Sequence, residues 1–181
     1  MEILVIRHGE SEDETIDLNE PLTTLGIEQS KKMSLRVSQE FPPEIIWSSP
    51  LQRARETAQI LATTVDCPIH YVDDLREQDQ EESGLHFHQR VRQIFSHIKD
   101  SSKPFKRIAI VSHGGTITKL IQTFLQLPPE SNAWFHTNNT GIHFLDYHSK
   151  ADIIKFANST DHLKPFKTAP VWSFHSGNPS D

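Results

Sequence analysis

Short apolar runs alternate with longer amphipathic stretches along most of this chain. Apolar runs bounded by polar or turn-forming residues are typical of buried strands, and the sequence predicts such strands at residues 3–6, 44–47, 69–72 and 107–111. Apolar residues at helical spacing predict helices at about residues 24–40, 51–65, 87–98 and 117–125. Two further segments predict an antiparallel pair of strands, at residues 140–147 and 151–158.

This alternation of strands and helices indicates an α/β fold. The sequence predicts a three-layer α/β/α domain, in which helices cover both faces of a mostly parallel sheet and an antiparallel strand is added near the C-terminus. The 181 residues suit one such domain, which we expect at residues 1–163. Residues 164–181 are rich in proline and carry Trp172 and Phe174, and we expect them to form a partly docked or disordered tail.

Two histidines follow predicted strands directly. Arg7 and His8 come after the apolar run at 3–6, and His113 comes soon after the run at 107–111. Ligand sites of open α/β sheets lie at the carboxyl ends of strands, so both histidines would share one crevice if the strands are parallel neighbours. Glycines follow both, Gly9 and Gly114, and would let a phosphate approach the backbone closely. One such histidine is more often packed or solvated than catalytic, but the repetition favours a functional site.

Arg53 is expected to join this site. It lies in the first turn of the helix predicted at 51–65, where unpaired backbone N–H groups and the helix dipole already favour an anion. Two imidazoles beside arginines suit a phosphate group, which presents several oxygens to them. The sequence therefore predicts a phosphate site.

His8 is the candidate nucleophile of this site. Imidazole has an ordinary pKa of about 6.5, which leaves much of it neutral at neutral pH, and its product, a phosphohistidine, is labile enough to hydrolyse. We expect a backbone carbonyl to accept from the other ring nitrogen and to orient the ring. Arg7, Arg53 and His113 are the candidate groups that stabilise the phosphoryl charge.

Composition excludes several other functions. The net charge is −6 and the basic residues form no stripe, which disfavours nucleic-acid binding. Cys67 is the only cysteine, so an intrachain disulfide is impossible. We expect no signal peptide, and no apolar run is long enough to span a membrane, so we expect no membrane partner and a cytoplasmic location. We expect no cofactor and no metal, because side chains supply the cations; His86 and His88 are expected on a solvated helix face.

Five stretches resemble the histidine phosphatase superfamily, in its phosphoglycerate mutase-like branch, and they occur in the family's order from residue 1 to about 163. They are residues 7–11, 21–26, 48–57, 75–77 and 112–115. The resemblance implies a phosphoglycerate mutase-like sheet, phosphohistidine formation on His8, and a phosphate pocket of Arg7, Arg53 and His113. It also implies that Glu77 is the general acid. The alternative is that Glu77 is a surface carboxylate in an acidic stretch.

The chain departs from the family pattern at two places. Many relatives insert a few dozen residues of cap after the position of Glu77, whereas here the matching Glu82 follows with only four residues between them. The chain is therefore expected to be a member with a minimal cap. The acidic residues 12–14 replace residues typical of the mutases, and we expect them to repel highly anionic substrates and to favour a neutral or cationic remainder.

These features predict a metal-independent phosphatase that hydrolyses phosphomonoesters. Its partner would be a small phosphoester or a phosphorylated protein. Three alternatives stay open: a phosphoglycerate-type mutase, a phosphoprotein phosphatase, and a phospho-ligand binding module without turnover. A mutase needs a closed lid over its intermediate, which the short cap disfavours. The sequence does not specify the substrate.

Overall fold

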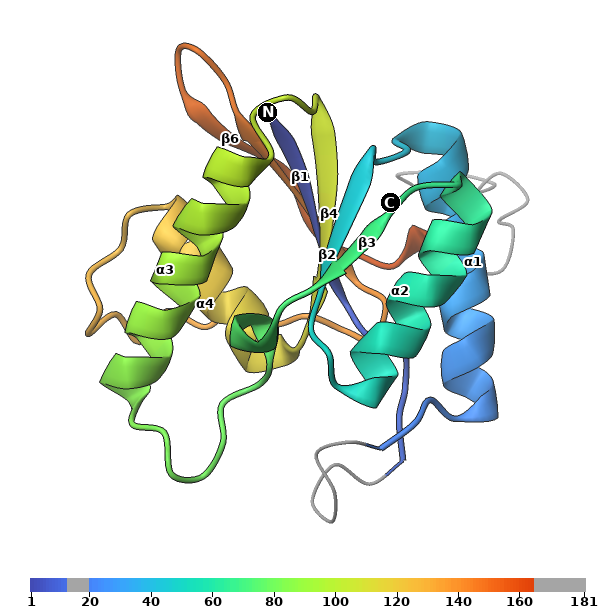
Figure 1. Ribbon diagram of the computed structural model, residues 1–181, viewed down its shortest axis with the longest axis horizontal. Coiled ribbons are helices and arrows are strands. Elements are labelled where there is room, and N and C mark those ends of the chain that lie inside the picture. The colour runs from blue at the N-terminus through green and yellow to red at the C-terminus, as the bar shows by residue number, and fades with distance from the viewer. Residues whose placement is uncertain (13–19, 165–181) are drawn as a thin grey trace, which may run out of the picture.

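The computed structural model describes residues 1–12 and 20–164, which form a central sheet between two layers of helices (Figure 1). The strands are β1 (Glu2–Arg7), β2 (Ile45–Ser48), β3 (Ile69–Tyr71), β4 (Arg107–Ser112), β5 (Ile142–Tyr147) and β6 (Asp152–Ser159). Their order across the sheet is β3-β2-β4-β1-β5-β6. The first four in this order are parallel, whereas β5 runs antiparallel to β1 and β6 antiparallel to β5. The predicted mostly parallel sheet with an antiparallel C-terminal addition is confirmed.

Two helices lie on each face of the sheet. They are α1 (Thr24–Glu40), α2 (Gln52–Val65), α3 (Gly84–Ser101) and α4 (Gly114–Phe124), with short 3-10 turns η1 (Asp73–Leu75) and η2 (Asp161–Leu163). Helices α1 and α2 cover one face, and α3 and α4 cover the other (Figure 1). The predicted three-layer α/β/α arrangement is therefore confirmed.

The apolar run of β1 explains why the chain needs helices on both sides. Successive strand side chains point to opposite faces, so Ile3 and Val5 pack with α3 and α4, while Leu4 and Ile6 pack with α1 and α2. All four are fully buried. Because both faces of β1 are covered, its residues are continuously apolar rather than alternating. The same packing holds the strand that carries His8 at its end.

Several boundaries differ from those predicted by one to three residues, and two of them have a clear local cause. Helix α3 begins at Gly84, ahead of its first apolar residues, because the Ser83 side chain caps it by accepting from the His86 backbone N–H. Strand β5 begins only at Ile142, because Thr140 adopts a left-handed conformation with a φ of 56°. The Thr140 N–H points at the carbonyls of Arg7 and His8, at the end of β1, instead of joining a ladder.

The expectation of a solvated face for the two α3 histidines is wrong for one of them. His86 is exposed, but His88 is buried. His88 lies three residues before Val91 and seven before Phe95, which are core residues of α3, and residues at this spacing share a helix face.

Other expectations fall partly on residues outside the described ranges. Trp172 and Phe174, which we expect to dock, lie outside the described ranges, and so do Asp13 and Glu14 of the acidic residues 12–14. The division at residue 163 therefore stays a prediction. Within the described ranges, no helix is both long and apolar enough to cross a lipid bilayer.

Candidate active site

His8 and His113 lie side by side because their strands are neighbours. Arg7 of β1 is in register with Ser112 of β4, so both chains leave the sheet at the same point. The two imidazole rings have centroids 5.1 Å apart and are tilted by 55°. Both side chains are only 1% exposed. The two histidines predicted at neighbouring strand ends therefore lie side by side.

The backbone around His8 is held from two sides. Its N–H donates to the Ser112 carbonyl (3.1 Å), and the Thr140 N–H lies within hydrogen-bond distance of the carbonyls of both Arg7 (3.1 Å) and His8 (3.2 Å). The left-handed turn at Thr140 thus closes the edge between β1 and β5 and fixes where the His8 side chain leaves the sheet.

Two hydrogen bonds define the protonation of His8. Its Nδ1 lies 2.7 Å from the Gly9 carbonyl, which can only accept, so Nδ1 carries the proton. Arg53 Nε, which can only donate, lies 3.2 Å from the other ring nitrogen, Nε2. Burial and the positive charges of Arg53 and Arg7 hold the pKa of His8 well below its usual value. His8 is therefore a neutral imidazole with its lone pair on Nε2, and its ring is oriented by a backbone carbonyl as expected.

Arg53 reaches His8 from the start of α2. The helix begins at Gln52, separated from the end of β2 by residues 49–51, and Arg53 is buried in its first turn. Thr57, one turn later, donates to the Arg53 carbonyl (2.8 Å) and accepts from the Gly9 N–H (3.1 Å). The loop after β1 is thereby tied to the helix that carries Arg53.

The two strand-end glycines serve different needs. A Cβ added at Gly9 would lie 2.5 Å from the Gly26 carbonyl oxygen in α1, so packing against that helix requires glycine there. A Cβ added at Gly114 would lie 3.9 Å from Arg7 Nε, an ordinary contact. Gly9 therefore has a packing reason to be glycine, and the predicted role of both glycines in letting a phosphate approach the backbone stays a prediction.

His113 is oriented by Ser49, a residue for which the sequence predicted no specific role. The His113 Nε2 atom lies 2.8 Å from Ser49 Oγ, and Ser49 Oγ also accepts from the Leu51 N–H (3.3 Å). Its hydroxyl proton can therefore point to Nε2, which places the His113 proton on Nδ1. Nδ1 is buried and has no hydrogen-bond partner within residues 1–12 and 20–164. Burial, followed by His8 and Arg53, holds the pKa of His113 well below its usual value.

Arg7 is held by a chain of contacts that the sequence did not indicate. Its guanidinium donates to the Thr137 carbonyl (3.0 Å), and Thr137 Oγ1 lies 2.8 Å from His143 Nε2. His143 Nδ1 accepts from the Asn158 N–H (3.3 Å), so the proton of neutral His143 lies on Nε2. Burial lowers the pKa of His143 to about 4. A neutral histidine on β5 therefore supports the loop that positions Arg7.

Glu77 sits at the N-terminus of α4, the helix that His113 caps. Its carboxylate accepts from the N–H groups of Gly115 (2.8 Å) and Thr116 (3.1 Å). A Cβ added at Gly115 would lie 2.5 Å from Glu77 Oε1, so this contact depends on glycine. The neighbouring acids are engaged elsewhere: Asp79 accepts from backbone N–H groups of its own loop, and Glu82 forms a salt bridge with Arg90 (2.6 Å).

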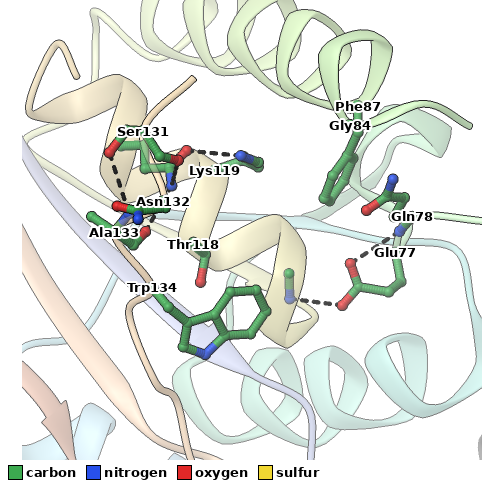
Figure 2. A pocket seen from close by; sticks show the side chains of 12 residues that line it. Glu77, Gln78, Gly84, Phe87, Thr118, Lys119, Ser131, Asn132, Ala133 and Trp134 are labelled. Atoms are coloured by element: carbon green, nitrogen blue, oxygen red, sulfur yellow. Dashed lines mark hydrogen bonds between the residues drawn. The ribbon is translucent and has the colours of Figure 1, made fainter. Parts of the chain in front are cut away.

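Beside Glu77, a groove of about 490 Å³ opens between α3, α4 and residues 131–134 (Figure 2). Its lining includes Glu77 and Gly115, which lie at the start of α4 next to His113. In the described part of the chain, no three histidine, cysteine or carboxylate side chains are grouped so that they could hold a metal ion. The structure thus brings together the predicted side chains of Arg7, His8, Arg53 and His113, and Glu77 lies at the N-terminus of α4.

Comparison with known proteins identifies the family that the sequence stretches resemble. The family model described as the histidine phosphatase superfamily (branch 1) matches residues 3–81 and 78–160. The chain is 24% identical to the uncharacterized phosphatase PhoE of Bacillus subtilis, over 91% of this chain and 97% of that protein. It is 32% identical to the metal-independent phosphoserine phosphatase of Arabidopsis thaliana, over 42% of this chain and 35% of that protein.

Solved structures show the same fold. Phosphoserine phosphatase from Entamoeba histolytica, in complex with 3-phosphoglyceric acid, superposes with a TM-score of 0.77 at 24% identity, covering 90% of this chain and 99% of that one. A putative α-ribazole-5'-P phosphatase from Escherichia coli also has a TM-score of 0.77, at 23% identity, covering 88% and 97%. The family model matches most of the chain, and this protein belongs to the histidine phosphatase superfamily.

Proposed function

We propose that this protein is a metal-independent phosphatase that hydrolyses phosphomonoesters through a phosphohistidine on His8. The observation that carries the proposal is the state of His8. Its Nδ1 proton is held by the Gly9 carbonyl, and its Nε2 lone pair accepts from Arg53 Nε. A buried histidine with a fixed tautomer is a nucleophile that needs no separate base.

In the first step, Nε2 of His8 attacks phosphorus and the bond to the leaving oxygen breaks. Arg53 then moves its hydrogen bond from Nε2 to a phosphoryl oxygen, since Nε2 has become part of the new bond. Arg7 and the Nδ1–H of His113 supply further donors to the charge that spreads over the phosphoryl oxygens. His8 keeps its Nδ1 proton on the Gly9 carbonyl, so the phosphorylated ring is positively charged and is a good leaving group in the next step.

Glu77 is the proposed general acid and base. In its protonated form it gives its proton to the leaving oxygen, and the resulting carboxylate takes a proton from the water that attacks the phosphohistidine. The phosphorus–nitrogen bond breaks, inorganic phosphate leaves, and neutral His8 and protonated Glu77 are restored. Support comes from the position of Glu77 at the N-terminus of α4, next to the helix cap His113.

Hydrolysis fits the structure better than a mutase reaction. Only residues 78–83 lie between Glu77 and α3, which leaves no room for a cap domain at the place where many relatives insert one. A mutase must exclude water and retain its intermediate. A small-molecule substrate is favoured over a phosphoprotein because related structures were solved with phosphoserine and with 3-phosphoglyceric acid bound.

The proposal is tested by measuring phosphate release from a panel of small phosphomonoesters after dialysis of the protein against EDTA. We expect release to continue without added metal and to be lost in His8→Asn. The same reaction mixtures, supplied with 3-phosphoglycerate and trace bisphosphoglycerate, report isomer interconversion. Isomerisation faster than phosphate release would make the protein a mutase, and binding of phosphomonoesters without any release would make it a binding module.

A further inference from the structure

The groove beside Glu77 is built from three separate segments. Its lining residues come from residues 77–87 (the loop before α3 and the first turn of α3), from residues 115–122 of α4, and from residues 131–134 after α4 (Figure 2). Only Glu77 and Lys119 among the lining residues carry charge. The proposed reaction assigns a role to Glu77, but none to the remaining residues.

The groove begins next to the residues that are proposed to bind the phosphoryl group. Gly115 lines it, and Gly115 is two residues after His113, so their Cα atoms are no more than about 7.6 Å apart. The intervening Gly114 packs against the Arg7 guanidinium, since its added Cβ would lie 3.9 Å from Arg7 Nε. Glu77 also lines the groove, and it accepts from the Gly115 N–H. A phosphoryl group held by Arg7 and His113, with Glu77 at its leaving oxygen, therefore places the rest of the substrate in the groove.

Lys119 supplies an uncompensated positive charge in the groove. Its ammonium group donates to Gln122 Oε1 (3.0 Å), and no carboxylate of the described residues lies within 4 Å of it. The side chain is half-buried, and burial lowers the pKa of Lys119. A cation that is partly removed from water and lacks an acidic partner favours an anionic ligand group.

Trp134 supplies a flat apolar wall. It is 67% exposed, which is unusual for a tryptophan, and it lies in the segment 131–134 (Figure 2). A hydrogen bond holds this segment against α4: the Gln122 amide donates to the Ala133 carbonyl (2.7 Å). Phe87, which is 2% exposed, contributes an aromatic surface from α3. An aromatic ring in the groove would find a face to stack on.

We propose that this groove binds the leaving group of the substrate and selects aryl phosphates that carry a carboxylate. The aromatic ring stacks on Trp134 and the carboxylate pairs with Lys119. This inference rests on the proposed phosphatase function. It also differs from the expectation of a neutral or cationic remainder, which was based on the acidic residues 12–14; of these, only Glu12 lies within the described residues.

The test compares kcat/KM for 4-carboxyphenyl phosphate and phenyl phosphate. Taking the ratio of the two, and comparing that ratio between variants, cancels the intrinsic difference between the leaving groups. We expect Lys119→Met to lower the ratio about tenfold, as expected for loss of a charged hydrogen bond. The matched control, Lys103→Met, removes an exposed lysine that pairs with Asp100 on α3 and should leave the ratio unchanged.

Trp134→Ala tests the stacking part. We expect it to lower kcat/KM for both aryl phosphates about threefold or more, and to leave glycerol 2-phosphate unaffected, because that substrate has no ring. An unchanged ratio in Lys119→Met, or equal losses for aryl and glycerol esters in Trp134→Ala, would overturn the corresponding part of the proposal.

The experiments separate an error in the proposed leaving-group site from an error in the proposed phosphatase function. If phenyl phosphate is hydrolysed but the ratio does not respond to Lys119→Met, the groove is not the leaving-group site and the phosphatase function stands. If no ester is hydrolysed, the phosphatase function fails, and calorimetric binding of 4-carboxyphenyl phosphate then tests the groove. Binding weakened about tenfold by Lys119→Met, but not by Lys103→Met, would support it; equal binding by all three proteins would overturn it.

Discussion

The Nε atom of Arg53 lies 3.2 Å from Nε2 of His8, and donates a hydrogen bond to the nitrogen that would attack phosphorus. A buried cation against a neutral imidazole keeps that nitrogen free of a proton. The same guanidinium is then in place to stabilise the phosphoryl group when it arrives. In the proposed mechanism, this one side chain prepares the nucleophile before the reaction and compensates charge during it.

Replacement of Arg53 should therefore be severe. We expect Arg53→Ala to lower kcat/KM about a hundredfold or more, equivalent to about 3 kcal/mol of transition-state stabilisation. Thermal unfolding of the variant shows whether it is folded. The matched control is Arg55→Ala, because Arg55 is exposed on the same helix and stacks over Tyr71 (4.7 Å). Equal losses at both positions would contradict the role given to Arg53.

Glu77→Gln should have an effect that depends on the leaving group. A glutamine cannot give a proton to the leaving oxygen, so the variant should lose about a hundredfold or more in kcat/KM on an alkyl phosphate. It should lose much less on 4-nitrophenyl phosphate, whose leaving group departs without protonation. Glu81→Gln, at an exposed position in the same loop, is the control. A uniform loss on both esters would show that Glu77 has a structural role only.

Acidification should destabilise the fold through its buried histidines. The pKa of His143 is about 4 in the folded protein and about 6.5 in an unfolded chain. Between these values the unfolded state binds more protons, so the stability that this residue contributes is present above pH 6.5 and is lost as the pH falls toward 4. From pH 7 to pH 5 the expected loss is about 2 kcal/mol for this group.

Urea unfolding at both pH values measures this loss. His143→Gln should show a fall in unfolding free energy between pH 7 and pH 5 that is about 2 kcal/mol smaller than that of the native protein. His86→Gln, which alters an exposed histidine, should show the native fall. A pH dependence that is the same in all three proteins would contradict the assignment of His143 as a buried neutral group.

The sequence predicted the parts of the site that follow from strand ends. His8 and His113 could be placed together because buried runs precede both, and Arg53 could be added because a helix start follows a third run. The contacts that support these residues could not be predicted, since they join distant segments: Arg7 and Thr137 are 130 positions apart, and Ser49 and His113 are 64 apart. Ser49 had a positional signal, because it too follows a strand directly.

His88 shows a different kind of error. Its polarity suggested a solvated position, but helix periodicity places it with Val91 and Phe95 on the buried face of α3. The pattern of neighbouring residues was the better guide there than the character of the residue itself. Glu77 differs from His88: the family resemblance implied its role as general acid, which stays a prediction. Its geometry depends on Gly115, which only the folded structure brings to it.

Trapping of the covalent intermediate tests the central claim most directly. Glu77→Gln, mixed with an excess of 4-nitrophenyl phosphate and quenched in alkali after a short time, should accumulate phosphoenzyme, because formation needs no acid while hydrolysis lacks its base. The account predicts one phosphoryl group on His8, stable in base, lost in acid, and absent when His8→Asn is added to the variant. A phosphoryl group on a serine, on an aspartate or on another histidine would contradict it.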